Sequence, residues 1–323
     1  MNYVNELVID NKCKQSTLKD KILFTGVGVH NGRAVTMSLE PANVDTGIIF
    51  KRTDINNCNN EVKAIIQNVV NSSLCTKISN AKGVSVSTIE HIMAAFSALN
   101  IDNVIVKINA PELPALDGSS YEYVKKIINV GIKTQNKKRK VLKILKKVEV
   151  KNGDRFISIT PSDDLSINIS INYPETIIGH SEYFYTHSQH NFINNLSMAR
   201  TYTLYEDIEK MRTAGLAIGG NLNNAIVVDK YKILNPNGLR LEKEFVKHKT
   251  LDCVGDFYLL GMPLIGNINC FAPGHNLNQK LIKEILKYKD NYKIEYIKSD
   301  SNSDNFFDLV KDENSSQNIT NVA

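Results

Sequence analysis

His248, Asp252 and Asp256 follow one another at intervals of four residues. If this segment is helical, the three side chains project from one face, which places an imidazole and two carboxylates along a single stripe. Such a stripe can bind a metal ion. A histidine and an aspartate one turn apart also occur often on solvated helices, so the spacing alone leaves a metal site and a weak polar pair both open.

A third ligand would make this stripe part of a catalytic zinc site. Catalytic zinc takes three protein ligands, commonly two histidines and a carboxylate, and leaves a fourth position for water. His248 and Asp252 could supply two ligands from one helix, and His91 could supply the third from a distant segment. These residue types therefore suggest one catalytic Zn²⁺ as the cofactor.

Three further residues could move protons beside such a metal ion. Glu90, the neighbour of His91, could act as general base on the attacking water. His275, in a loop that precedes a predicted helix, is a candidate proton donor, and Asp256 at the end of the stripe could orient it.

The other histidines carry weaker signals. His180, His187 and His190 lie in a polar stretch between predicted strands, where their irregular spacing favours solvated side chains over a metal-binding tract. His30 lies in a turn with three glycines in seven residues, and we interpret it as a packing or hydrogen-bonding group.

A mixture of strands and helices must position these residues. Apolar spacing predicts helices over residues 89–99, 120–130, 242–261 and 276–288. Ser87 or Thr88 is the expected cap of the first helix. Alternating apolar residues predict strands at 22–25, 34–40, 47–52, 103–108, 141–150, 155–160, 165–173 and, as the last strand, 265–271. Two successive sets of strands and helices indicate an α+β protein.

The length of 323 residues suits two domains, each large enough to bury a core of its own. We predict an N-terminal domain over residues 16–136, a C-terminal domain over 141–297 and a polar, disordered tail over 298–323. The basic run Lys137–Lys140 between the domains is interpreted as a solvated connector.

The composition argues against several classes of protein. With 42% hydrophobic residues and a net charge of +5, the chain is typical of a soluble globular protein, and its scattered lysines do not form the basic face of a nucleic-acid binder. Five cysteines without a CxxC pair indicate neither a disulfide framework nor a cysteine zinc site. No apolar run is long enough to span a membrane. We expect a cytoplasmic monomer and leave peripheral membrane proximity open.

Five longer motifs lie between about Ser16 and about Lys287, and they are Gly26–His30, Ser87–Ala95, Pro111–Ser119, Phe245–Asp252 and Gly274–Asn278. Together, and in this order, they resemble the UDP-3-O-acyl-N-acetylglucosamine deacetylases, the zinc amidases of lipid A biosynthesis. The resemblance implies two similar two-layer α+β domains, each a sheet packed on helices, with the active site between them.

The resemblance also implies a role for each matching residue. The implied roles are zinc ligands for His91, His248 and Asp252, general base for Glu90, catalytic histidine for His275 with Asp256 as its partner, and substrate and oxyanion contacts for Lys249 and Thr201. The family's acyl-chain passage corresponds to about residues 202–228. Tyr202 and Leu222 are the expected substrate-binding residues there, at or near positions that are often phenylalanine, so the preferred acyl length stays open.

The implied reaction is zinc-dependent hydrolysis of the 2-acetamido group of UDP-3-O-(3-hydroxyacyl)-N-acetylglucosamine. It yields UDP-3-O-acyl-glucosamine and acetate, and it is the committed step of lipid A biosynthesis. The alternative is a non-catalytic nucleotide-sugar-binding protein that retains the fold. The segment after the last predicted helix is too short for a fused dehydratase domain, which some relatives carry.

Overall fold

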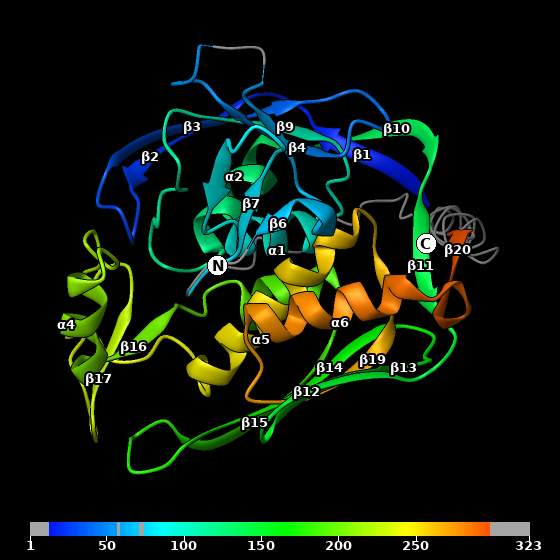
Figure 1. Cartoon of the computed structure of the whole chain (residues 1–323). Helices are drawn as coiled ribbons and strands as arrows, with labels where there is room; N and C mark the ends of the chain where they lie inside the picture. The colour runs from blue at the N-terminus through cyan, green and yellow to red at the C-terminus, as the bar shows by residue number, and fades with distance from the viewer. Residues whose placement is uncertain (1–12, 57–58, 71–73, 298–323) are drawn as a thin grey trace, which may run out of the picture.

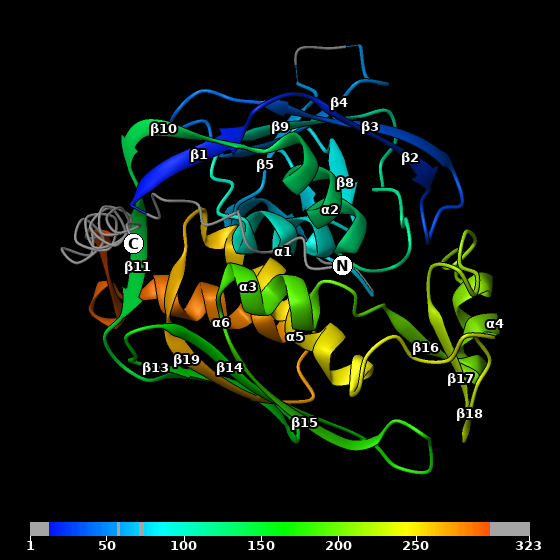
Figure 2. The same cartoon turned by 180° about the vertical axis from the view of Figure 1, so that it is seen from behind.

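The computed structural model describes residues 13–56, 59–70 and 74–297. Two sheets form opposite outer faces of the molecule, and helices fill the space between them (Figure 1, Figure 2). The layers follow one another as sheet, helices, helices and sheet, which confirms the predicted α+β class. The domain boundaries at 16–136 and 141–297 remain a prediction, and the predicted tail lies outside the described residues.

The N-terminal half is built on a five-stranded sheet with helices beneath it. Its main elements are β2 (Ile22–Val27), β3 (Ala34–Pro41), β4 (Ile48–Arg52), β5 (Glu61–Lys63), β9 (Val104–Ile108), α1 (Glu90–Ala98) and α2 (Tyr121–Val130). The strand order is β2-β3-β9-β4-β5, with β4 parallel to β9 and the other pairs antiparallel. Every second residue of β4 and β9 is buried, so these strands present one apolar face to the helices.

Two small sheets complete this half. Their elements are β1 (Lys14–Leu18) with β10 (Ile132–Lys138), and β6 (Val69–Val70), β7 (Lys77–Ser79) and β8 (Ser85–Ser87), preceded by the short helix η1 (Ile66–Asn68). Strand β8 ends just before α1, so the three-stranded sheet fixes the start of the helix that carries Glu90 and His91.

The C-terminal half repeats the plan with a larger sheet. Its strands are β11 (Lys140–Ile144), β12 (Val148–Asn152), β13 (Arg155–Thr160), β14 (Leu165–Tyr173), β15 (Gly179–Thr186), β19 (Leu264–Phe271) and β20 (Tyr292–Tyr296). Its helices are α5 (Glu244–Phe257) and α6 (His275–Lys287), with the short α3 (Gln189–Asn191), η2 (Phe192–Leu196), η3 (Tyr258–Leu260) and η4 (Lys289–Asn291). Strand β19 is central, because it pairs with β11, β13 and β14.

An insert between η2 and α5 stands at one side of the molecule (Figure 1). It consists of β16 (Tyr202–Leu204), α4 (Tyr205–Thr213), β17 (Ile226–Asp229) and β18 (Lys232–Ile233), whose strands form a small sheet of their own. In the described part of the chain, no helix is both long enough and apolar enough to cross a membrane.

Helices α1 and α5 pack directly against each other at Gly255. A Cβ atom at this position would lie 2.0 Å from the Glu90 carbonyl oxygen and 3.1 Å from the Ala94 nitrogen. Only glycine permits this approach of two helix backbones. Because α1 belongs to the N-terminal half and α5 to the C-terminal half, this contact brings the predicted catalytic segments together.

Two sequence-based predictions of local structure are wrong. Neither Ser87 nor Thr88 caps α1, since the N-cap is Ile89 and makes no side-chain hydrogen bond. The backbone at Thr88 is left-handed, with φ at 59°, and its hydroxyl donates to Glu112 Oε1 at 3.2 Å instead. The predicted strand at 265–271 is not the last one, because β20 follows the last predicted helix and pairs with β11 at the sheet edge.

The basic run Lys137–Lys140 is not a fully solvated connector. Arg139 is only 3% exposed, and its Nε donates to Asp102 Oδ1 at 2.7 Å while Nη2 donates to the Tyr258 hydroxyl at 3.2 Å. A run of four basic residues gives no sign that one is buried, because the partners lie elsewhere in the chain. Arg139 therefore ties the connection between the halves to both of them.

Candidate active site

A cavity of about 1230 Å³ opens between the two halves. Its lining includes Glu90 and His91 from α1, His248 and Asp252 from α5, and His275 from α6. The fold thus brings together five of the residues that we predicted to do chemistry.

His91, His248 and Asp252 form a compact set of potential metal ligands. Their ligand atoms all lie within 4.8 Å of one another. The Asp252 Oδ1 is 3.4 Å from His248 Nε2 and 3.7 Å from His91 Nε2, and the two imidazole rings meet edge to face. Among the residues that the structure describes, no other group of three histidine, cysteine or acidic side chains comes this close.

The charge states of this set suit a metal ion. Burial, assisted by the neighbouring His248, lowers the pKa of His91 to about 3, and burial also lowers the pKa of His248, so both imidazoles are neutral. Burial would raise the pKa of Asp252, but its neighbours, the charged Lys249 ammonium among them, hold it below its usual range. Asp252 Oδ1 is buried without a hydrogen-bond partner. A buried, ionised and unpartnered oxygen beside two neutral imidazoles fits a cation.

Two contacts orient this set. His248 Nδ1 lies 3.0 Å from the Ala199 carbonyl oxygen, which can only accept, so Nδ1 carries the proton and Nε2 is free to face Asp252. The Lys249 ammonium donates to Asp252 Oδ2 at 3.1 Å and leaves Oδ1 unengaged.

Asp256 lies behind His275 rather than in the cavity lining. Its Oδ2 is 2.8 Å from His275 Nδ1 and also accepts from Asn278 Nδ2 at 2.8 Å. Burial lowers the pKa of His275, but Asp256 and Glu90 outweigh it and raise the pKa to about 10. The ring is therefore protonated at neutral pH, with Nδ1 bonded to Asp256 and Nε2 3.9 Å from Glu90 Oε1.

Glu90 is a buried carboxylic acid rather than a solvent-exposed one. It is 3% exposed, and burial raises its pKa to about 7 against the lowering effect of His275. Its Oε2 accepts from the Thr76 main-chain N–H at 2.9 Å. The Thr76 hydroxyl donates to Asp256 Oδ1 at 2.5 Å, so Thr76 hydrogen-bonds to both Glu90 and Asp256.

Residues from the insert form another wall of the cavity. Thr201, Tyr202 and Leu222 all line it, as predicted for substrate-contacting groups, although the roles of the three stay predictions. The Tyr202 ring lies edge-on to His248, with ring centroids 6.3 Å apart, and the Lys249 ammonium sits 5.6 Å from the centre of that ring.

The family described as UDP-3-O-acyl N-acetylglycosamine deacetylase matches residues 15–287 of the chain. The chain belongs to this family. It is 39% identical over 281 residues to the UDP-3-O-acyl-N-acetylglucosamine deacetylase of Campylobacter fetus subsp. fetus (strain 82-40), covering 87% of this chain and 94% of that protein. The chain is 42% identical over 275 residues to the same-named protein of Pasteurella multocida (strain Pm70), and the match covers 84% of this chain and 90% of that protein. It is 40% identical over 297 residues to the same-named protein of Wigglesworthia glossinidia brevipalpis, and the match covers 91% of this chain and 99% of that protein.

Membership of this deacetylase family confirms the resemblance and makes the chain a hydrolase. The match spans the segments that carry the residues lining the cavity. It gives no support to the non-catalytic alternative, because the relatives are named as deacetylases.

Sequence patterns assigned no catalytic role to several residues that lie in or behind this cavity. Thr76 lies in a loop 180 residues away from Asp256 in sequence, and no local pattern marks it. Asn278 could have been found, because it follows His275 by three residues on α6 and so shares its face. His30 lines the cavity, and its Nδ1 is buried without a hydrogen-bond partner.

Of the other three histidines, none joins a metal set in the described part of the chain. His180 is exposed and pairs with Glu182 at 3.0 Å. His187 is half-buried, and its Nδ1 is hydrogen-bonded to the Tyr185 hydroxyl at 3.1 Å. Burial lowers the pKa of His187 to about 4. The prediction of solvated side chains is therefore wrong for His187.

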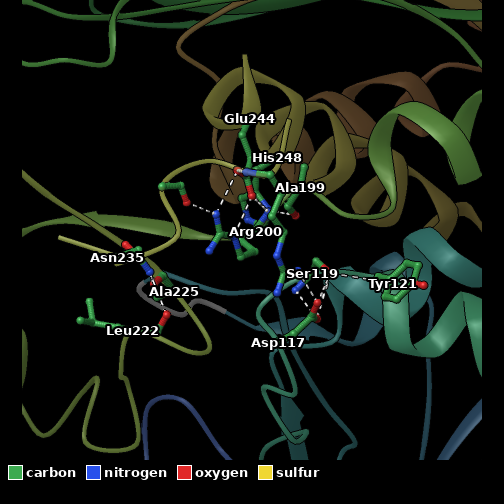
Figure 3. Close-up of polar contacts among 12 residues, drawn as sticks. Asp117, Ser119, Tyr121, Ala199, Arg200, Leu222, Ala225, Asn235, Glu244 and His248 are labelled. Atoms are coloured by element: carbon green, nitrogen blue, oxygen red, sulfur yellow. Dashed lines mark hydrogen bonds and ion pairs between the residues drawn. The ribbon is translucent and has the colours of Figure 1, made fainter. Parts of the chain in front are cut away.

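Asn235 holds the insert wall in shape (Figure 3). Its Oδ1 accepts from the Val227 N–H at 2.9 Å, and its Nδ2 donates to the Leu222 and Ala225 carbonyls at 2.8 Å each. The side chain is 4% exposed, so water cannot replace it easily.

We expect Asn235→Ala to lower the free energy of unfolding by about 1–3 kcal/mol, because it strands buried backbone groups. Exchange of the Val227 amide with deuterium should rise well before global unfolding. Chemical denaturation and hydrogen exchange followed by mass spectrometry measure both effects. The exposed Asn223→Ala is the matched control, and equal behaviour of the two variants would contradict the prediction.

Proposed function

We propose that the chain hydrolyses the 2-acetamido group of UDP-3-O-acyl-N-acetylglucosamine, as the relatives' names indicate, and so serves lipid A biosynthesis. Water and the amide give acetate and the free amine. The observation that carries the proposal is the unpartnered Asp252 Oδ1 beside His91 and His248 in a cavity that also holds Glu90 and His275.

The proposed metal is one Zn²⁺ held by His91, His248 and Asp252. Two neutral imidazoles and one carboxylate are a usual ligand set for catalytic zinc. When bound, zinc would supply Lewis-acid activation of water and of the substrate carbonyl.

The side chains divide the proton transfers between them. Glu90, with a pKa raised to about 7, takes the proton of the attacking water as it adds to the acetamide carbonyl. The protonated His275, held by Asp256, gives a proton to the leaving amine. The cycle closes when Glu90 releases its proton and His275 takes one up again, which restores both side chains for the next turnover.

Thr201 and Lys249 are proposed to hold the substrate and to stabilise the oxyanion of the tetrahedral intermediate. Both line the cavity from the C-terminal half. Burial lowers the pKa of Lys249, but Asp252 outweighs it and raises the pKa, which keeps the ammonium charged. A fixed cation near a developing negative charge favours the transition state over the ground state. Tyr202 and Leu222 are proposed to contact the acyl chain.

The test combines zinc stoichiometry with acetate release. We expect one zinc per chain in the purified protein and acetate from UDP-3-O-acyl-N-acetylglucosamine of at least one acyl length in a graded series. Asp252→Ala should lose both the metal and the activity. A wild-type protein that binds no zinc, or releases no acetate at any acyl length, would end the proposal.

A further inference from the structure

Arg200 and Glu244 form an ion pair that solvent scarcely reaches (Figure 3). Arg200 Nε donates to Glu244 Oε1 at 2.8 Å and Nη2 donates to Oε2 at 3.1 Å, with side chains 6% and 0% exposed. Removing two charges from water costs hydration energy, so a buried pair is weak grounds for a purely stabilising role.

Glu244 also accepts two main-chain N–H groups. The Arg200 nitrogen donates to Oε1 at 3.1 Å, and the Arg240 nitrogen donates to Oε2 at 2.6 Å. Arg200 Nη2 additionally donates to the Gly238 carbonyl at 2.8 Å. One carboxylate at the start of α5 therefore holds the backbone of two separate segments.

The backbone held in this way includes the carbonyl that orients a proposed metal ligand. Glu244 lies four residues before His248 on α5, and Arg200 directly follows Ala199. The Ala199 carbonyl accepts from His248 Nδ1 at 3.0 Å. Glu244, Arg200, Ala199 and His248 are thus linked in a closed chain of contacts, which we call the frame (Figure 3).

We propose that Arg200 and Glu244 are positioning residues, which hold the Ala199 carbonyl against His248 Nδ1 and so aim Nε2 at the metal. The proposal rests on the metal site of the proposed function. The frame itself consists of protein groups only, so its effect on His248 can be measured without metal or substrate. Carbonyl partners of this kind set the tautomer and the orientation of ligand histidines.

The test uses the full chain, first metal-free and then with Zn²⁺ alone. Glu244→Gln removes the charge at nearly constant shape, and Arg200→Gln removes the guanidinium. Long-range ¹H–¹⁵N spectra show which ring nitrogen of His248 carries the proton, and competition with a chromophoric chelator gives the zinc Kd. We expect loss of the single Nδ1–H tautomer in both variants and zinc binding weaker by about 10- to 100-fold.

A matched control breaks an arginine–carboxylate pair elsewhere. Arg52 Nη2 donates to Asp54 Oδ2 at 2.7 Å in the N-terminal half, so Arg52→Gln should leave the tautomer and the zinc Kd unchanged. If the single variants do not fold, Arg200→Met/Glu244→Leu replaces the pair with apolar side chains of similar size, and the same losses are expected.

Wild-type tautomer and wild-type zinc affinity in the folded variants would overturn the proposal. Failure of the proposed function looks different, because it appears in the wild-type protein as absent zinc binding or absent acetate release. A changed tautomer in the metal-free variants would still support the frame in that case.

Discussion

Replacing Glu90 with glutamine is expected to reduce acetate release by about 10²- to 10⁴-fold, the usual contribution of a general base. The amide of glutamine keeps the shape and can still accept from the Thr76 N–H, but it cannot take a proton from water. Because Glu90 is not a member of the ligand set, zinc content should stay at the wild-type value. Steady-state acetate release and metal analysis on the same preparation check both parts.

A matched control for this prediction is Glu122→Gln, since Glu122 also lies in the first turn of a helix of the N-terminal half. It should keep full activity. The activity of His275→Gln should fall by a similar factor to that of Glu90→Gln. The double variant should fall by less than the product, because the two residues act together in one hydrolysis reaction. Full activity in either single variant would remove that residue from the mechanism.

Replacing Gly255 with alanine is expected to separate the two helices that build the site. The added Cβ would lie 2.0 Å from the Glu90 carbonyl oxygen, a backbone atom that cannot rotate away. Overpacking usually costs about 1–3 kcal/mol, and a clash between two helix backbones belongs at or above the upper end of that range. Since Glu90 and His91 sit on α1 and His248 on α5, we expect most of the activity and the tight zinc binding to be lost as well.

Thermal unfolding, zinc affinity and acetate release test this prediction together. In an unconstrained helix, Gly→Ala would raise the free energy of unfolding by about 1 kcal/mol. A lower free energy of unfolding for Gly255→Ala would therefore show that the clash with α1 outweighs this gain. Gly274→Ala is the stability control, because a Cβ there meets no atom within 4 Å. An unchanged or raised Tm for Gly255→Ala would show that the helices can move apart without penalty.

Local patterns were sufficient for most of the elements and for part of the site. Alternating burial along β4 and β9 and the continuous apolar spacing of α1 follow from side-chain periodicity, so strands and helices were found in about the right places. The same periodicity predicted that His248, Asp252 and Asp256 share a face of α5, which the structure confirms in placing all three on that helix.

Predictions failed where a partner from another segment decides the outcome. Arg139 looked like one of four solvated basic residues, yet Asp102 and Tyr258 bury it. The cap expected at Thr88 was replaced by a contact with Glu112. In both cases the local sequence permits several conformations, and a distant polar group satisfies only one of them.

The sequence by itself determined which residues could do chemistry here and, through the order of its motifs, the family to which the chain belongs. Only the tertiary structure decided how their surroundings and charge states differ. Close packing at Gly255 puts Glu90 beside the histidine set, and Thr76 reaches Asp256 across 180 residues of sequence. Burial and opposite charges then raise the pKa of Glu90 to about 7 and that of His275 to about 10. These shifts depend on distances between segments that have no sequence neighbourhood in common, which is why no spacing rule could supply them.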